Sequence, residues 1–126
     1  KLKNINKVIM CSGKIYFDLL EAREKYKRGD IVLLRIEQLY PFPAKSLVKS
    51  IKQYAKNAQF IWCQEEPKNM GAWSHVRDYI QWTLDFIKAN NKNVSYIGRA
   101  PAASPATGYA KRHLAQQKEI LEKVFN

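Results

Sequence analysis

A candidate anion-binding segment lies where a short apolar run gives way to a helical pattern. In Cys11-Ser12-Gly13-Lys14, the backbone N–H groups and the Lys14 ammonium could hold a phosphate at the start of a helix. The segment lacks the longer glycine-rich lead of a P-loop and the three spaced glycines of a dinucleotide-binding turn. A turn between a strand and a helix, capped by Ser12, explains the same residues without a ligand.

Two carboxylates, Glu65 and Glu66, follow another apolar run and could act as a general acid and base. Neighbouring residues on an extended segment point to opposite sides, so these side chains do not form a ready-made pair. We therefore expect one of them to pair with an arginine or to cap the next helix, and we favour that role over catalysis.

The other reactive side chains are too scattered to predict a catalytic or metal site. His75 and His113 are the only imidazoles, and together with Cys11 and Cys63 they show no zinc-ligand spacing. The sequence has no Gly-x-Ser-x-Gly nucleophile elbow. A small independent enzyme would need Glu66 and His113 to meet in one pocket, and nothing in their spacing demands this.

Composition indicates one soluble domain from a reducing compartment. The 126 residues are 46% hydrophobic and 26% charged, which suits one core and excludes a disordered chain. Both cysteines lie inside apolar runs, as buried reduced thiols do, and no apolar run approaches the ~20 residues of a membrane span. The chain starts without methionine, so we expect a piece of a longer polypeptide.

Basic residues outnumber acidic ones by 22 to 11, and the net charge is +11. Such a charge suits nucleic acid, anionic lipid, phosphate ligands or an acidic protein surface. A freestanding basic α/β module that binds nucleic acid or phosphate ligands is therefore one alternative. The lysines are spread over every predicted helix, which makes nucleic acid an unlikely partner because its binding favours basic residues on one face.

Short β-branched runs alternate with longer amphipathic stretches, and this alternation predicts the elements that position the candidate residues. We expect strands at 7–11, 31–36, 59–64 and 94–97, and helices at 12–28, 44–55, 72–89 and 109–124. The pattern predicts an α/β domain of three layers, a mostly parallel sheet with helices on both faces. In such sheets function gathers at the carboxyl ends of the strands.

Several details of these elements are also predicted. Residues 31–36 are almost continuously apolar, which predicts a central strand. Gly29 is expected to end the first helix. The spacing of apolar residues places Tyr26 on the inner face of that helix and Leu114 in the apolar stripe of the last one.

Four segments at predicted turns and loops occur together in a fixed order. They read CSGKIY at 11–16, RIEQLYPFP at 35–43, WCQEEPKNMGAW at 62–73 and GRAPAASPATG at 98–108. Together they resemble the C-terminal domain of the E1 component of 2-oxoglutarate dehydrogenase, a thiamine-diphosphate enzyme. The resemblance covers essentially the whole chain, residues 1–126, as one domain of a longer E1 subunit.

The resemblance implies a transketolase C-terminal-domain-like fold and a function shared with the rest of E1. In this family, E1 decarboxylates 2-oxoglutarate on thiamine diphosphate and transfers the succinyl group to the lipoyl arm of E2, feeding the citric acid cycle. The cofactor and its Mg²⁺ are held by the two preceding domains, and their Gly-Asp-Gly motif is absent from these residues. We therefore expect no catalytic, cofactor-binding or metal-binding residue here, and an inactive isolated domain.

The resemblance also implies the partners and the compartment. The expected partners are the N-terminal and central domains of E1, a second E1 protomer in a homodimer, and the E2 succinyltransferase, without a membrane. The compartment would be the bacterial cytoplasm or, in a eukaryote, the mitochondrial matrix.

Loop residues are the candidates for contacts with these partners, namely Glu65, Glu66, Asn69, Trp73, Arg99 and Ser104. We expect Trp73 to be the apolar anchor, and Glu65, Glu66 and Arg99 to make charge-assisted hydrogen bonds. Some members of the family bind an acyl-CoA or nucleotide effector on this domain. The candidates for holding such an anion are Ser12, Lys14 and Arg28.

Overall fold

A parallel sheet of four strands, in the order β2-β1-β3-β4, forms the centre of the domain. The computed structural model describes residues 4–101 and 110–126, with side chains in the second range from Leu114 onward. The strands are β1 Lys7–Cys11, β2 Ile31–Arg35, β3 Gln59–Pro67 and β4 Ser95–Arg99. The helices are α1 Ile15–Tyr26, α2 Ala44–Ile51, the short 3₁₀ helix η1 Lys52–Tyr54, α3 Trp73–Phe86 and α4 Ala110–Phe125.

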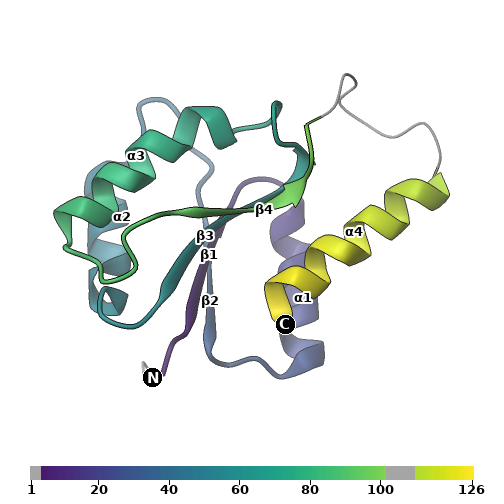
Figure 1. Ribbon diagram of the computed structural model, residues 1–126, viewed down its shortest axis with the longest axis horizontal. Helices are drawn as coiled ribbons and strands as arrows, with labels where there is room; N and C mark the ends of the chain where they lie inside the picture. Colours follow the sequence, from purple (N-terminus) through teal and green to yellow (C-terminus); the bar gives the residue numbers. More distant parts are fainter. Residues whose placement is uncertain (1–3, 102–109) are drawn as a thin grey trace.

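Helices cover both faces of the sheet, α2 and α3 on one side and α1 and α4 on the other (Figure 1). Alternate residues of β1 belong to the two cores. Val8 and Met10 pack with α2 and α3, whereas Ile9 and Cys11 pack with α1 and α4. The three-layer α/β fold expected from the sequence is confirmed. Within the described residues, no helix has the length and apolar character needed to cross a membrane.

The prediction that residues 31–36 form a central strand is wrong. Among the described strands, β2 lies at one edge of the sheet and pairs with β1 alone, while β1 and β3 are the central strands. Val32 and Leu34 pack toward one core and Leu33 toward the other. A continuous apolar run therefore indicates that both faces of a strand are covered by other elements. It does not indicate whether the strand pairs with one neighbouring strand or with two.

The ends of α1 differ from the prediction. Lys27, with a φ of 53°, takes the left-handed conformation that ends the helix, and Gly29 does not. The backbone N–H of Arg28 then bonds to the carbonyl of Arg23 at 3.1 Å. Lys14 stands at the start of α1 without a side-chain cap, so the expected cap by Ser12 is also wrong.

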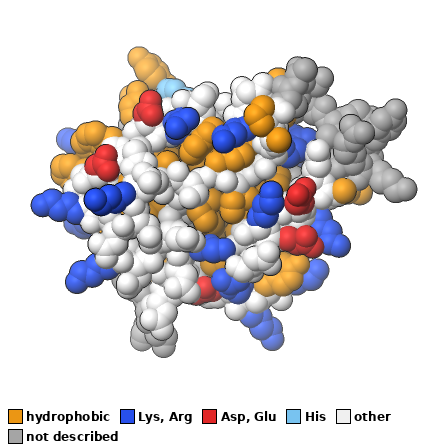
Figure 2. Space-filling model, in the orientation of Figure 1, with side chains coloured by type: hydrophobic (Ala, Val, Ile, Leu, Met, Phe, Trp, Pro, Cys, Tyr) orange, Lys and Arg blue, Asp and Glu red, His pale blue; other side chains and the backbone are white. Residues whose placement is uncertain are grey.

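Two side chains that were expected inside lie on the surface. Tyr26 is 48% exposed and Leu114 is 68% exposed. Elsewhere the surface carries basic side chains in many places, and Figure 2 shows lysine and arginine on all sides of the visible face, with fewer carboxylates.

Candidate functional site at the carboxyl edge of the sheet

A cleft of about 450 Å³ opens at the carboxyl edge of the sheet, between the ends of β1 and β3. The helices that follow these neighbouring strands, α1 and α3, lie on opposite faces, which is where ligands bind in open α/β sheets. The lining includes Ser12 and Gly13 after β1, Leu39 and Tyr40 after β2, Gln64 of β3 and His75 of α3.

The carboxylate of Glu37 occupies the position predicted for an external anion. It accepts hydrogen bonds from the Gly13 backbone N–H at 2.9 Å and from the Ser12 hydroxyl at 3.3 Å. The Arg35 guanidinium forms an ion pair with the same group at 2.8 Å. The Gly13 N–H, followed by Arg35, lowers the pKa of Glu37. The turn after β1 therefore binds an anion that belongs to the protein itself.

Ser12, Lys14 and Arg28 do not form one anion pocket. Lys14 makes ion pairs with Asp18 at 3.1 Å and Glu65 at 3.2 Å, and these carboxylates raise its pKa. Arg28 precedes β2 and therefore lies at the opposite, amino edge of the sheet. The prediction that Ser12, Lys14 and Arg28 form one anion site is therefore wrong. In a parallel sheet, residues that follow β1 and residues that precede β2 lie at opposite edges, one strand length apart.

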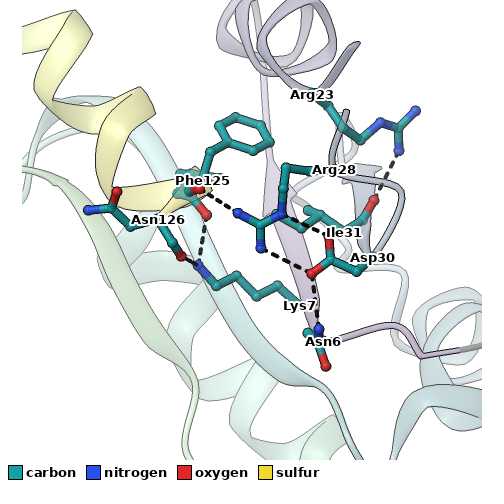
Figure 3. Close-up of polar contacts among 9 residues, drawn as sticks. Asn6, Lys7, Arg23, Arg28, Asp30, Ile31, Phe125 and Asn126 are labelled. Atoms are coloured by element: carbon teal, nitrogen blue, oxygen red, sulfur yellow. Dashed lines mark hydrogen bonds and ion pairs between the residues drawn. The ribbon is translucent and has the colours of Figure 1, made fainter. Parts of the chain in front are cut away.

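Arg28 instead fastens the end of α4 to the sheet (Figure 3). Its guanidinium forms an ion pair with Asp30 at 2.9 Å and donates to the Phe125 carbonyl. From β1, the Lys7 ammonium donates to the Val124 carbonyl at 2.8 Å. Two cations thus meet the unpaired carbonyls at the carboxyl end of a helix, where the helix dipole favours positive charge.

Gln64 organises the floor of the cleft, and sequence reasoning missed it. Its amide oxygen accepts from the Trp62 indole at 2.9 Å and from the Trp73 backbone N–H at 3.1 Å. Its amide nitrogen donates to the carbonyls of Pro67 at 2.9 Å and Met70 at 2.8 Å. The sequence signal that could have identified Gln64 is its position as a polar residue at the end of an apolar run. In the structure Gln64 is 2% exposed.

Glu65 and Glu66 lie on β3, which extends to Pro67, and not in the loop after it. Glu65 is partly buried and pairs with Lys14, whereas the Glu66 side chain is exposed. The predicted absence of a carboxylate pair agrees with this alternation. Arg99 of β4 donates to the Glu65 backbone carbonyl and to the Gln116 side chain of α4, the latter at 3.1 Å.

The interface candidates are only partly exposed. Trp73 is 6% exposed and packs against Tyr96 with ring centroids 5.4 Å apart, so its indole belongs to the core of the domain. It is therefore unavailable as the expected external anchor. Asn69 is exposed in the loop before α3. Ser104 and the side chain of His113 lie outside the described residues.

The two thiols are buried on neighbouring strands. Burial raises the pKa of Cys11 to about 12, and burial also raises the pKa of Cys63. Within residues 4–101 and the described side chains of α4, no three His, Cys, Asp or Glu residues are grouped to hold a metal ion.

Known proteins resemble this chain at the levels of both sequence and structure. Two relatives, the 2-oxoglutarate dehydrogenase E1 components of Brucella anthropi and Brucella ovis, are each 53% identical over 118 residues. The match covers 94% of this chain but 12% of each relative, so the chain spans about an eighth of their length.

A solved structure described as a split-gene transketolase, in the form of an inactive tetramer of four beta subunits, shares the fold. The TM-score is 0.62 at 16% identity, over 97% of this chain and 39% of that chain. The family described as 2-oxoglutarate dehydrogenase C-terminal matches residues 1–125. On this match, and with the four motifs in their predicted order, the chain belongs to the 2-oxoglutarate dehydrogenase C-terminal family.

Proposed function

We propose that this domain completes an E1 subunit that oxidatively decarboxylates 2-oxoglutarate and succinylates the lipoyl arm of E2. Its own part is to support assembly of the E1 dimer and the region around the active site. Thiamine diphosphate, whose thiazolium carbanion performs the decarboxylation, and Mg²⁺ belong in this proposal to the preceding domains. The Brucella relatives are bacterial, and a cytoplasmic location is part of the same proposal.

The observation that carries this division of labour is the state of three ionisable groups that lie beside the cleft, at the carboxyl ends of the strands. Glu37 is bound by Gly13 and Arg35, and Glu65 is paired with Lys14. The Cys11 thiol is buried, with its pKa raised to about 12. Groups engaged in this way hold loops in place, whereas a catalytic acid or base needs a pKa near the working pH and access to substrate.

The contacts that we propose with other parts of E1 come from the loop between β3 and α3 and the segment that starts at Arg99. Glu66, near the end of β3, and Asn69, in the loop after it, present exposed polar side chains at this edge. Trp73 supports the loop from inside, because its backbone N–H bonds to Gln64 and its ring packs on Tyr96. This revises the expected role of Trp73 from external anchor to internal support.

A charge reversal tests this role in the complete E1 polypeptide. Glu66→Lys should lower the dimer fraction or the rate of 2-oxoglutarate oxidation about tenfold, because a charge facing a partner is inverted. Glu21→Lys on α1 is the matched control at another exposed glutamate. Sedimentation and ferricyanide reduction give the two readouts. Equal behaviour of both variants and wild type would reject a contact at Glu66.

No effector is assigned to Ser12, Lys14 and Arg28, because the first two bind carboxylates of the protein and the third lies at the other edge. The freestanding nucleic-acid module is not favoured, since the chain belongs to an enzyme family across residues 1–125.

A further inference from the structure

A row of lysines covers α2 and the segment after it, in a stretch of sequence that contains no acidic residue. No Asp or Glu occurs between Glu37 and Glu65, and the only charged side chains there are Lys45, Lys49, Lys52 and Lys56. All four are exposed, and none takes part in an ion pair among the described residues. The spacing of Lys45, Lys49 and Lys52 places them on one side of the helix, opposite buried Leu47.

Exposed aromatic side chains form a second row on α3. Tyr79, Trp82 and Phe86 are 43%, 53% and 61% exposed, and their spacing of three and four residues places them on one face. Trp82 and Phe86 stack with ring centroids 5.2 Å apart. Tyr79 stacks on Phe42 at 5.0 Å. Aromatic rings of this size are normally buried, so a row of them on one face indicates a contact surface.

The two rows lie beside each other. Phe42, which stacks on Tyr79, is two residues before the start of α2. At the other end of α3, Asn90 donates to the carbonyls of Ala55 and Lys56, both at 2.9 Å. Figure 2 shows apolar and basic side chains over the α2 and α3 side of the molecule, with carboxylates among them, and Asp78 and Asp85 of α3 are exposed. We call Lys45, Lys49, Lys52, Tyr79, Trp82 and Phe86 the α2–α3 surface.

The chemistry of this surface defines what can cover it. Lysine ammonium groups without ion pairs favour a partner surface that carries carboxylates, and half-exposed rings favour apolar side chains on the same partner surface. A second copy would bring a second lysine row and would be repelled. Nucleic acid would favour arginines and rings open for base stacking, whereas this surface has no arginine and its rings are already stacked in pairs.

We propose that the α2–α3 surface docks on an acidic surface with an apolar centre, carried by the part of E1 outside these residues. The proposal rests on the proposed function, in which the domain works inside a longer E1 subunit, and it adds the face and the chemistry of the contact. The length of the relatives supports it, because 88% of each lies outside the region that matches this chain.

Acetylation of lysines, read by mass spectrometry, tests the proposal in the complete E1 polypeptide and in the 126-residue chain. Lys45, Lys49 and Lys52 should react about tenfold more slowly in the complete polypeptide. This factor is expected if the surface is docked, and its lysines are unreactive, in about ten molecules for every one that is undocked. Lys25 and Lys118, exposed on α1 and α4, are internal controls that should react equally in both. Equal rates at the α2 lysines in both proteins would overturn the proposal.

Variants and a nuclease control identify the occupant. K45E/K49E should abolish the protection of Lys52, and W82S/F86S should abolish the protection of Lys45, Lys49 and Lys52, whereas K25E/K118E/K123E should preserve it. Loss of protection after nuclease treatment would assign the surface to nucleic acid and reject the proposal. Protection at Lys68 beside Glu66, without protection on α2, would reject the α2–α3 surface but leave the proposed function standing. No protection at any lysine would count against both.

Discussion

One buried amide, that of Gln64, determines the shape of the cleft. Its hydrogen bonds with Trp62, Glu66, Pro67, Met70 and Trp73 join β3 to the loop that leads into α3. Both ends of the amide are engaged, so it acts as a cross-link of backbone and indole groups inside the core. The loop that carries the proposed contacts is held by this side chain.

Replacing Gln64 with leucine should lower the free energy of unfolding by about 3 kcal/mol, because buried donors and acceptors lose their partners. Gln59→Leu, at the exposed start of the same strand, is the matched control and should change it by less than about 0.5 kcal/mol. Urea denaturation followed by tryptophan fluorescence gives both values. A loss below about 1 kcal/mol at Gln64 would show that water replaces these hydrogen bonds.

Local alternation was predictable at the residue scale, whereas the burial of Tyr26, Leu114 and Trp73 and the long-range partners were not. The opposite orientations of Glu65 and Glu66 followed from strand geometry. The carboxylate of Glu37 at the turn after β1 could not be foreseen, because its contacts with Ser12 and Gly13 join residues more than twenty positions apart. Ser12, Glu65 and Glu66 were therefore expected at the correct edge of the sheet, whereas Arg28 lies at the other edge and Gln64 was missed.

At the scale of elements, the positions of the strands and helices in the sequence were predicted correctly. The errors concern where α1 begins and ends and which strands lie beside β2. Lys27 ends α1 although a glycine is available two residues later. The edge position of β2 was missed because helices cover both faces of edge and centre strands alike. Strand order depends on crossovers, and an apolar run carries no information about them.

The end of α1 offers a stabilising substitution. Lys27→Gly should raise the free energy of unfolding by about 0.5–1 kcal/mol, because a φ of 53° costs a lysine conformational energy that glycine avoids.

Gly29→Ala is the paired control for this helix end. A Cβ there meets nothing within 4 Å, and Gly29 is not among the positive-φ glycines. The substitution should therefore be neutral or stabilise slightly, by about 0.4–1 kcal/mol. Thermal unfolding compares the two variants, and destabilisation by Lys27→Gly would contradict the assigned end of the helix.

At the scale of the whole molecule, the cluster around Arg28 joins the first strand, the second strand and the last helix. Asn6 and Arg28 both bond to Asp30, and Arg28 and Lys7 reach the end of α4. The Arg28 guanidinium holds the pKa of Asp30 well below its usual range. The contact of Arg28 with α4 is therefore coupled to the charge of Asp30, whereas the contact of Lys7 with α4 is not.

This dependence predicts how stability changes with pH. The folded state lowers the pKa of Asp30, so its carboxylate stabilises the fold above the unfolded pKa of about 4 and loses this effect as the pH falls further. Asp30→Asn should lower the free energy of unfolding by about 1 kcal/mol at pH 7, a value that allows for partial solvent screening. The difference from wild type should shrink below pH 4.

Urea titrations of both proteins between pH 7 and pH 2.5 measure this difference. Asp85→Asn, at an exposed carboxylate of α3, is the control and should stay within about 0.5 kcal/mol of wild type at each pH. A constant gap between Asp30→Asn and wild type across the titration would contradict the role assigned to the charge.

The carboxylate of Glu37 has a consequence for every anion that reaches the cleft. It is a tethered competitor, present at an effective concentration of about millimolar or more. A phosphate group arriving from solution must displace Glu37 from Gly13 and Arg35. The apparent affinity for phosphate is therefore the intrinsic affinity multiplied by the fraction of molecules in which Glu37 is not bound there. Glu37 therefore lowers the occupancy of this turn by small anions at low concentration, because its carboxylate is attached to the same chain.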